Sequence, residues 1–313
     1  MKKLISVLLI LTLLLPCAFA GADFAADGMA GVLDKLDKNS YRTAYESLLE
    51  GEILEKGAEN NTAKALQRVL KAFGQDVSTD GKAGSGTFKE LNKVQNRYGM
   101  EPTDYVDAEV FAELLCALLV YQEGEDAEEA VLEAGLPEGE YYYCLARKQA
   151  SDGRYYRAKC SYEASGWADW ADRADSCAQK WPSDGRIWKK SSLIGSGVTF
   201  KIKVRNTDSD TANVFKLYNS DDKLVAVLFI GGNGSASTTL KAGRYTIKQG
   251  TGTEWYGRKD AFGEDGWYST LDVNGETSFK LKNGYIYTLT INTDDIDPNS
   301  DSVGSSYENW GDF

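Results

Sequence analysis

The spacing of hydrophobic residues changes once along the chain, and this change limits what the chain can fold into. Up to about residue 121, apolar side chains recur every three or four positions, which is the period of a helix with one buried face. From about residue 196 they alternate with polar ones, as in the segment from Val198 to Val204, which is typical of a half-buried strand. The sequence therefore predicts an α+β multidomain protein with a helical N-terminal part and a C-terminal antiparallel β-sandwich.

Three helices with recognisable ends are predicted within residues 41–121. One apolar stripe runs from Thr62 to a stop at Gly74, a second ends at Gly99, and Asp107 is placed to cap a third. Each apolar face is too wide to remain in water, so we expect the three helices to pack as a small bundle. The apolar positions are Ala63, Leu66, Leu70, Phe73, Phe88, Leu91, Val94, Tyr98, Val110, Phe111, Leu114, Leu115 and Leu118.

The segment from Glu55 to Leu119 resembles the peptidoglycan-binding-like domain family. Residues 57–74, GAENNTAKALQRVLKAFG, place a glycine before a helix that carries Leu-Gln. Residues 80–88, DGKAGSGTF, resemble the loop that opens the second helix of the family. The resemblance implies a three-helix fold that binds cell-wall peptidoglycan.

The same resemblance implies Gln67, Thr87 and Gln95 as the polar residues that contact ligand. The residues themselves also allow a structural interpretation of the loop. Asp80 can accept hydrogen bonds from its own downstream amides, and Gly81 tolerates the positive φ of a tight turn. In that interpretation the motif shapes the loop and touches no ligand.

The first twenty residues are predicted to be a secretory signal peptide. Lys2 and Lys3 precede an uncharged run from Leu4 to Leu15, and Ala18-Phe19-Ala20 offers a cleavage site. An uncleaved anchor is the alternative, but the run is shorter than the roughly 20 residues that span a bilayer. A lipoprotein cysteine at Cys17 is disfavoured because a proline precedes it. We expect a secreted or extracellular protein that associates with the cell envelope and has no membrane span after cleavage.

The chain contains no histidine, and this absence excludes several kinds of catalysis. Ser-His-Asp and Cys-His hydrolysis and zinc centres built on imidazole all need that side chain. Glycoside hydrolysis by two carboxylates remains open, but among 47 acidic residues a chance pair carries no weight. The net charge of −12 disfavours nucleic acid and anionic membranes as partners. We therefore expect no enzyme, no metal and no cofactor.

Residues 122–195 are predicted to be a helical connector, in which the stretch from Ala146 to Cys177 weakly resembles a tetratricopeptide-like helical pair. Its aromatic residues are interpreted as core, with a basic aromatic patch facing an anionic wall polymer as the alternative. These aromatic residues are Tyr141, Tyr142, Tyr143, Trp167, Trp170 and Trp181.

Four cysteines remain after removal of the signal peptide, and an exported protein permits disulfides between them. Cys116 lies within an apolar stretch and is interpreted as a core residue. One pair among Cys144, Cys160 and Cys177 is close enough in sequence to bond, but three connectivities of the four cysteines remain open.

Seven to nine antiparallel strands are predicted within residues 196–293. Hairpins are expected around residues 220–222, at Asn274-Gly275 and at Asn283-Gly284, because Asn-Gly tolerates two positive φ angles. The strand from Lys241 to Ile247 loosely resembles transthyretin-like and carboxypeptidase-regulatory-like sandwiches. Residues 294–313 are acidic and rich in Ser, Asn and Asp, which predicts a disordered tail.

Residues 251–268, TGTEWYGRKDAFGEDGWY, crowd aromatic residues between glycines. If these side chains are exposed on a loop, Trp255, Tyr256, Asp260 and Trp267 are candidates for contact with a glycan. The alternative is that the aromatic residues plug one end of the sandwich. The acidic residues of the loop lack the regular spacing of a calcium loop.

Together these patterns predict a secreted, non-catalytic cell-envelope protein that binds peptidoglycan through its N-terminal helical module. The alternative is a secreted carbohydrate-binding or interaction protein in which the β-sandwich carries the binding site. A glycosidase that uses two carboxylates is a third possibility.

Overall fold

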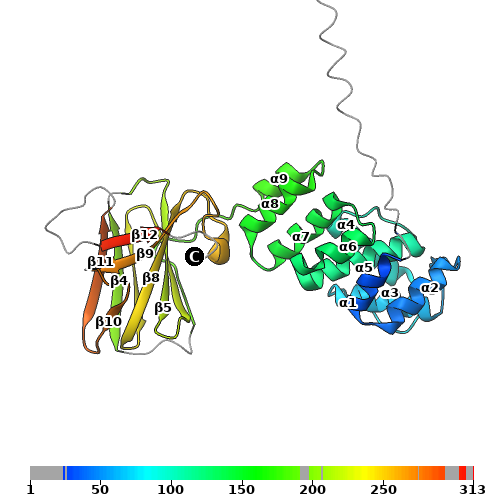
Figure 1. Cartoon of the computed structure of the whole chain (residues 1–313), viewed down its shortest axis with the longest axis horizontal. Helices are drawn as coiled ribbons and strands as arrows, with labels where there is room; N and C mark the ends of the chain where they lie inside the picture. The colour runs from blue at the N-terminus through cyan, green and yellow to red at the C-terminus, as the bar shows by residue number, and fades with distance from the viewer. Residues whose placement is uncertain are drawn as a thin grey trace, which may run out of the picture. The chain divides into compact units, whose positions relative to one another are not determined.

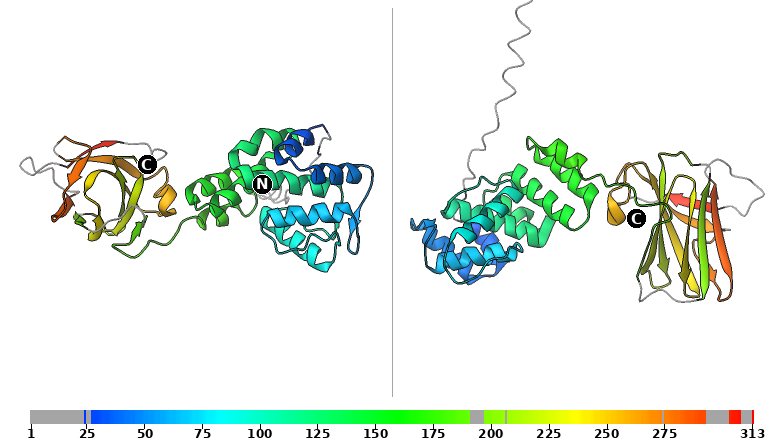
Figure 2. Two further views of the ribbon diagram at one scale, coloured as in Figure 1. Left: turned by 90° about the horizontal axis from the view of Figure 1, so that it is seen from below. Right: turned by 180° about the vertical axis from the view of Figure 1, so that it is seen from behind.

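The computed structural model describes residues 24, 27–190, 197–205, 207–273, 275–292, 303–307 and 313. The chain divides into two compact units (Figures 1 and 2). We call residues 27–152 and 158–175 the helical unit, and residues 153–157 and 176–313 the sheet unit. The predicted signal peptide lies outside the described residues. Within the described part, no helix combines the length and the apolar character that crossing a membrane requires.

The helical unit contains α1 to α9, the 3₁₀ helix η1 and a two-stranded ladder of β1 and β2. The elements are α1 (Met29–Leu36), α2 (Asn39–Leu49), β1 (Leu54–Glu55), α3 (Asn61–Ala72), α4 (Ser85–Tyr98), β2 (Tyr105–Val106), α5 (Ala108–Glu123), η1 (Gly124–Ala127), α6 (Glu128–Glu133), α7 (Glu138–Ser151), α8 (Tyr155–Ser165) and α9 (Trp170–Asp175).

The three helices predicted from the apolar spacing are α3, α4 and α5, and their ends follow from local chemistry. The Asn60 side chain accepts a hydrogen bond from the Ala63 amide at 2.7 Å, which caps α3. Asp107 caps α5 in the same way, through the Val110 amide at 2.9 Å. Gly99 ends α4 with a φ of 82°, a conformation that favours glycine.

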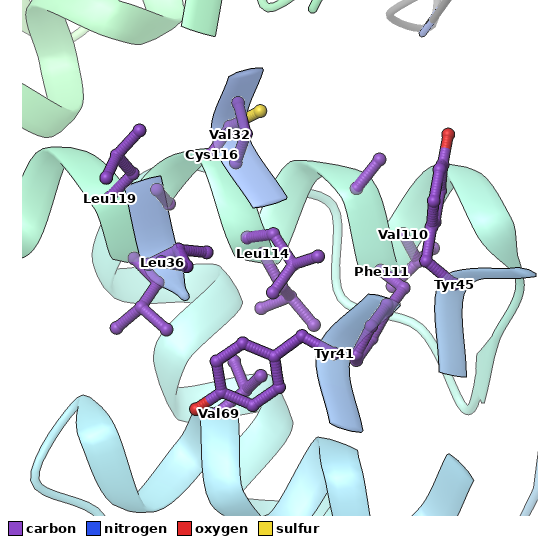
Figure 3. Close-up of a cluster of buried hydrophobic side chains, with 14 of the residues drawn as sticks. Val32, Leu36, Tyr41, Tyr45, Val69, Val110, Phe111, Leu114, Cys116 and Leu119 are labelled. Atoms are coloured by element: carbon purple, nitrogen blue, oxygen red, sulfur yellow. The ribbon is translucent and has the colours of Figure 1, made fainter. Parts of the chain in front are cut away.

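One shared interior holds these helices together. Leu66, Leu91 and Leu114, one from each helix, are fully buried in the same apolar cluster. Figure 3 shows side chains of α1 and α2, such as Val32 and Tyr41, gathered around α5. The predicted bundle is therefore confirmed, and it is larger than the three helices that the sequence analysis found.

Helix α1, like α2, was not among the helices predicted from the apolar spacing. It has eight residues, and its buried stripe is only Met29, Val32, Leu33 and Leu36. Gly28, directly before α1, lies very close to the end of α6. A Cβ added at Gly28 would be 2.2 Å from the Glu133 carbonyl oxygen. Glycine is therefore needed at this position because the two backbones approach each other.

The connector predicted for residues 122–195 does not form a unit of its own. Helices α6, α7 and most of α8 and α9 group with the helical unit, whereas residues 176–190 group with the sheet unit. Tyr141 and Tyr143 are buried, and Tyr143 stacks on Trp167 with ring centroids 4.7 Å apart. Most of the aromatic residues of this stretch therefore serve as core.

The sheet unit contains two β-sheets and the short helix α10 (Gly257–Asp260). The larger sheet has the order β12-β9-β8-β5-β6-β3, with β10 also pairing with β8, and the smaller has the order β11-β4-β7. The strands are β3 (Ile187–Lys189), β4 (Val198–Arg205), β5 (Ala212–Asn219), β6 (Leu224–Gly231), β7 (Gly234–Leu240), β8 (Gly243–Gly252), β9 (Trp267–Val273), β10 (Phe279–Leu281), β11 (Ile286–Asn292) and β12 (Val303–Tyr307).

The two sheets enclose one apolar core. The left view of Figure 2 shows their strands nearly end-on. The alternating residues Val198, Phe200, Ile202 and Val204 of β4 all point into this core, as predicted. The outer face of the larger sheet is also covered, by a second apolar cluster that includes Phe229, Trp255, Phe262, Tyr268 and Phe313. Because β5 and β6 are covered on both faces, both are buried almost throughout, and β6 is apolar along its length rather than alternating.

Three details of the predicted sandwich are wrong. Strand β11 runs parallel to β4, so the fold is not entirely antiparallel. The strands that flank residues 274–275 and 283–284 do not pair with each other, because β9 and β10 both join β8 while β11 joins β4. The hairpin around residues 220–222 does form, between β5 and β6.

The C-terminal segment is the third correction. Residues 303–307 were predicted to be disordered, yet they form β12 against β9. Phe313 is buried, with its ring centroid 4.7 Å from that of Tyr268. Composition alone favoured disorder, but the free edge of β9 gives this short segment backbone partners.

Candidate functional site

Gln67, a predicted ligand contact, lies inside the helical unit and bonds to the loop at residues 78–84. Its side chain is fully buried on α3. Its Nε2 donates to Asp80 Oδ1 at 2.9 Å and to the Lys82 carbonyl oxygen at 3.0 Å, and its Oε1 accepts from the Gly81 amide at 2.8 Å. All of these bonds lie within the domain, so a ligand cannot reach this amide.

Gln95 has the same role for the segment at residues 103–106. It is fully buried on α4, where its Nε2 donates to Thr103 Oγ1 at 3.1 Å and its Oε1 accepts from the Thr103 amide at 3.2 Å. Thr103 Oγ1 in turn donates to the Tyr105 carbonyl oxygen at 2.7 Å. Gln95 therefore positions Tyr105 through Thr103 and does not itself reach the surface.

Segment 53–60 connects these two loops into one continuous surface. On one side, Leu54 and Glu55 pair with Val106 and Tyr105 in the β1–β2 ladder. On the other side, backbone hydrogen bonds of 2.7 to 3.1 Å join residues 57–60 to residues 81–83. We call residues 53–60, 78–86 and 103–106 the loop surface.

The exposed side chains of the loop surface combine apolar and polar groups. Ile53 and Tyr105 are 57% and 40% exposed, which gives the surface an apolar part. The exposed side chains of Glu59 and Lys82 form an ion pair, with Oε1 and Nζ 2.6 Å apart. These are residue types that can contact the apolar face of a sugar and its polar substituents.

The amino end of α4 also belongs to this surface. Its N-cap residue, Gly84, supplies no side-chain hydrogen bond, and the exposed residues Ser85 and Gly86 follow. Amides at such an end carry partial positive charge and can donate to an anion or a carbonyl. Thr87, the third residue for which ligand contact was predicted, is buried and packs inward.

The charges of the loop surface are stable near neutral pH. Hydrogen bonds from the Gln67 side chain and the Lys82 amide lower the pKa of Asp80, so this carboxylate stays ionised. The hydrogen bond and the charge of Glu59 raise the pKa of Lys82, so this ammonium stays protonated. Neither Asp80 nor Lys82 is therefore poised to exchange a proton near neutral pH.

The family comparison bears directly on this domain. Residues 59–114 match the model of a family described as "Putative peptidoglycan binding domain". The resemblance found in the sequence from Glu55 to Leu119 is thereby confirmed. The match runs from the loop surface through α3 and α4 into α5. No curated protein matches the chain.

Most aromatic side chains of residues 251–268 in the sheet unit are buried in an apolar cluster. Trp255 and Tyr256 are buried. The ring centroid of Trp255 is 5.1 Å from that of Phe229 and 5.5 Å from that of Phe262. Asp260 is also buried and accepts a hydrogen bond from the Tyr156 amide at 2.9 Å. Of the four residues predicted to contact a glycan here, Trp267 is the one that is exposed, at 45%.

Acidic and cysteine side chains are also found outside the loop surface. Within the described ranges, no group of three or more acidic or cysteine side chains is placed to hold a metal ion. Burial raises the pKa of Glu113 on α5 to about 8 and that of Glu140 on α7 to about 7. Cys116 and Cys144 are buried nearby, and Cys116 is a core residue, as predicted.

Proposed function

We propose that this chain is an exported, non-catalytic protein that binds cell-wall peptidoglycan through its helical unit. The observation that carries the proposal is the family match over residues 59–114, on a domain whose three matched helices share one intact core. Export is supported by the pattern of the first twenty residues. The absence of histidine supports a role without the usual hydrolytic machinery.

The loop surface is the part of the domain that we propose for ligand contact. Peptidoglycan offers flat apolar sugar faces together with amide and carboxylate groups. The exposed Tyr105 ring and Ile53 side chain suit the apolar faces. The uncapped amides of α4 suit a carbonyl or carboxylate oxygen.

A sedimentation assay with insoluble peptidoglycan tests this proposal. We expect the mature chain to sediment with the polymer and the variant Tyr105→Ala to lose about tenfold in affinity, because one anchoring aromatic contact contributes on the order of 1–2 kcal/mol. Trp170→Ala is a matched control, since Trp170 is also an exposed aromatic residue of the helical unit but lies on α9, outside the matched residues. A mature chain that stays in the supernatant would refute the proposal. Equal losses in both variants would place the contact elsewhere.

A further inference from the structure

Two arginine side chains of the sheet unit lie over the same tryptophan ring. The guanidinium carbon of Arg186 is 5.8 Å from the centroid of Trp188, and that of Arg258 is 5.6 Å from it. Arg186 directly precedes β3, and Arg258 belongs to α10, more than seventy residues later in the chain. The fold therefore brings two like charges together at one place, which has an electrostatic cost unless something compensates for it.

No carboxylate provides that compensation within the part of the chain that the structure describes. Neither Arg186 nor Arg258 has an acidic group within 4.0 Å there. The arginine over an aromatic ring in the helical unit is different, because Arg173 lies over Tyr143 and is paired with Asp169 at 2.6 Å. The pair over Trp188 is thus unusual for this protein in lacking an internal counter-charge.

The Trp188 ring is held in place by other aromatic side chains. Trp188 stacks on the buried Trp255 with an interplanar angle of 14°, and Trp255 is wedged against Phe229 and Phe262. The backbone on both sides of Trp188 is fixed, since the Arg186 carbonyl oxygen accepts from the Phe229 amide at 2.9 Å. A ring that is already held in place needs little ordering to bind a ligand.

The surroundings of this cluster are basic and aromatic, although the whole chain carries a net charge of −12. From Lys180 to Lys190 there are four Lys or Arg and one Asp. Trp181 and Trp188 are both half-buried, so part of each indole faces solvent. The cluster therefore combines cationic donors with flat apolar surface.

We propose that Arg186, Trp188 and Arg258 form a binding surface for a polysaccharide whose sugars carry carboxylates. Guanidinium groups bind carboxylates with two parallel hydrogen bonds, and the part of the Trp188 indole that faces solvent offers apolar surface to a sugar ring. A simple polyanion lacks that apolar face and is repelled by the negative charge elsewhere on the protein. This inference is independent of the function proposed for the helical unit.

Titration of the mature chain with polygalacturonate, a polymer of carboxylated sugars, tests the inference. We expect saturable binding that weakens as salt is added, and a loss of at least about tenfold in affinity for the double variant Arg186→Gln/Arg258→Gln. Arg173→Gln is the matched control, because it removes a guanidinium that already has a carboxylate partner. Thermal unfolding followed by circular dichroism shows whether each variant is folded.

The outcomes separate this inference from its rivals. Retained affinity in a folded double variant would overturn it, as would no binding of polygalacturonate by the mature chain. Tighter binding of polyglutamate than of polygalacturonate would identify an acidic peptide as the partner and also overturn it. Trp188→Phe, which keeps an aromatic ring, is expected to retain most of the affinity. Tyr105→Ala is expected to leave it unchanged, so this result does not depend on peptidoglycan binding.

Discussion

Gln67 and Gln95 hold the loop surface from within the helical unit. Each is fully buried and uses both ends of its amide, Gln67 toward residues 80–82 and Gln95 toward Thr103. A leucine-glutamine pattern in a sequence motif does not show on which side of the helix the amide lies. The resemblance therefore identified residues that matter for the loops, but it did not show that their amides bond within the domain.

The variant Gln67→Ala tests this structural role. It leaves the Gly81 amide and part of the Asp80 carboxylate without their buried partner, so we expect the free energy of unfolding to fall by about 1–3 kcal/mol. Urea unfolding followed by circular dichroism measures the change. Arg68→Ala, at an exposed position of the same helix, is the control and should change it little. An unchanged stability together with lost peptidoglycan binding would restore Gln67 as a ligand contact.

At the scale of single elements, the packing of α5 against α7 makes the helical unit sensitive to pH. The pKa of Glu113 is raised to about 8 by burial and by the charges of Glu140 and Glu109, and that of Glu140 is raised to about 7 by burial. The folded protein therefore binds these protons more tightly than the unfolded chain does. The stability they contribute is complete below about pH 4 and is lost as the pH rises toward 8.

We accordingly predict that the helical unit unfolds at a lower temperature at about pH 9 than at about pH 6. Glu113→Gln, which keeps the shape but cannot ionise, should reduce this difference and stabilise the unit at the higher pH. Thermal unfolding of the two proteins across this range measures the effect. Identical pH profiles would show that Glu113 does not titrate with a raised pKa.

The elements themselves were predicted to different degrees. Helices α3, α4 and α5 were predictable because their apolar stripes are long and their ends are set by local residues, through side-chain caps in α3 and α5 and through Gly99 in α4. Strand partners were not, because Asn283-Gly284 specifies a tight reversal but not which sheet each flanking strand joins. The parallel pairing of β11 with β4 depends on burial across the whole sandwich, which no local pattern encodes.

At the scale of the whole molecule, the two units have separate apolar cores. Leu114 belongs to the core of the helical unit, and Phe215 belongs to the core between the two sheets. The sequence predicted this separation from its change of hydrophobic period. It did not predict that residues 176–190 would join the sheet unit, because β3 is a three-residue edge strand with little sequence pattern.

Separate cores predict separate responses to mutation. Leu114→Ala should destabilise the helical unit by about 2–5 kcal/mol, because it leaves a cavity at a fully buried position, and should leave the sheet unit unchanged. Phe215→Ala should do the reverse. Amide hydrogen exchange measured segment by segment distinguishes the units. A loss of protection in both units from either variant would contradict this independence.

The role of the helical unit is tested most directly by hydrogen exchange of the mature chain with and without soluble peptidoglycan fragments. The loop surface, at residues 53–60, 78–86 and 103–106, is predicted to gain protection, together with the first turn of α4. Protection confined to the sheet unit, or none at saturating fragment, would contradict binding through the helical unit.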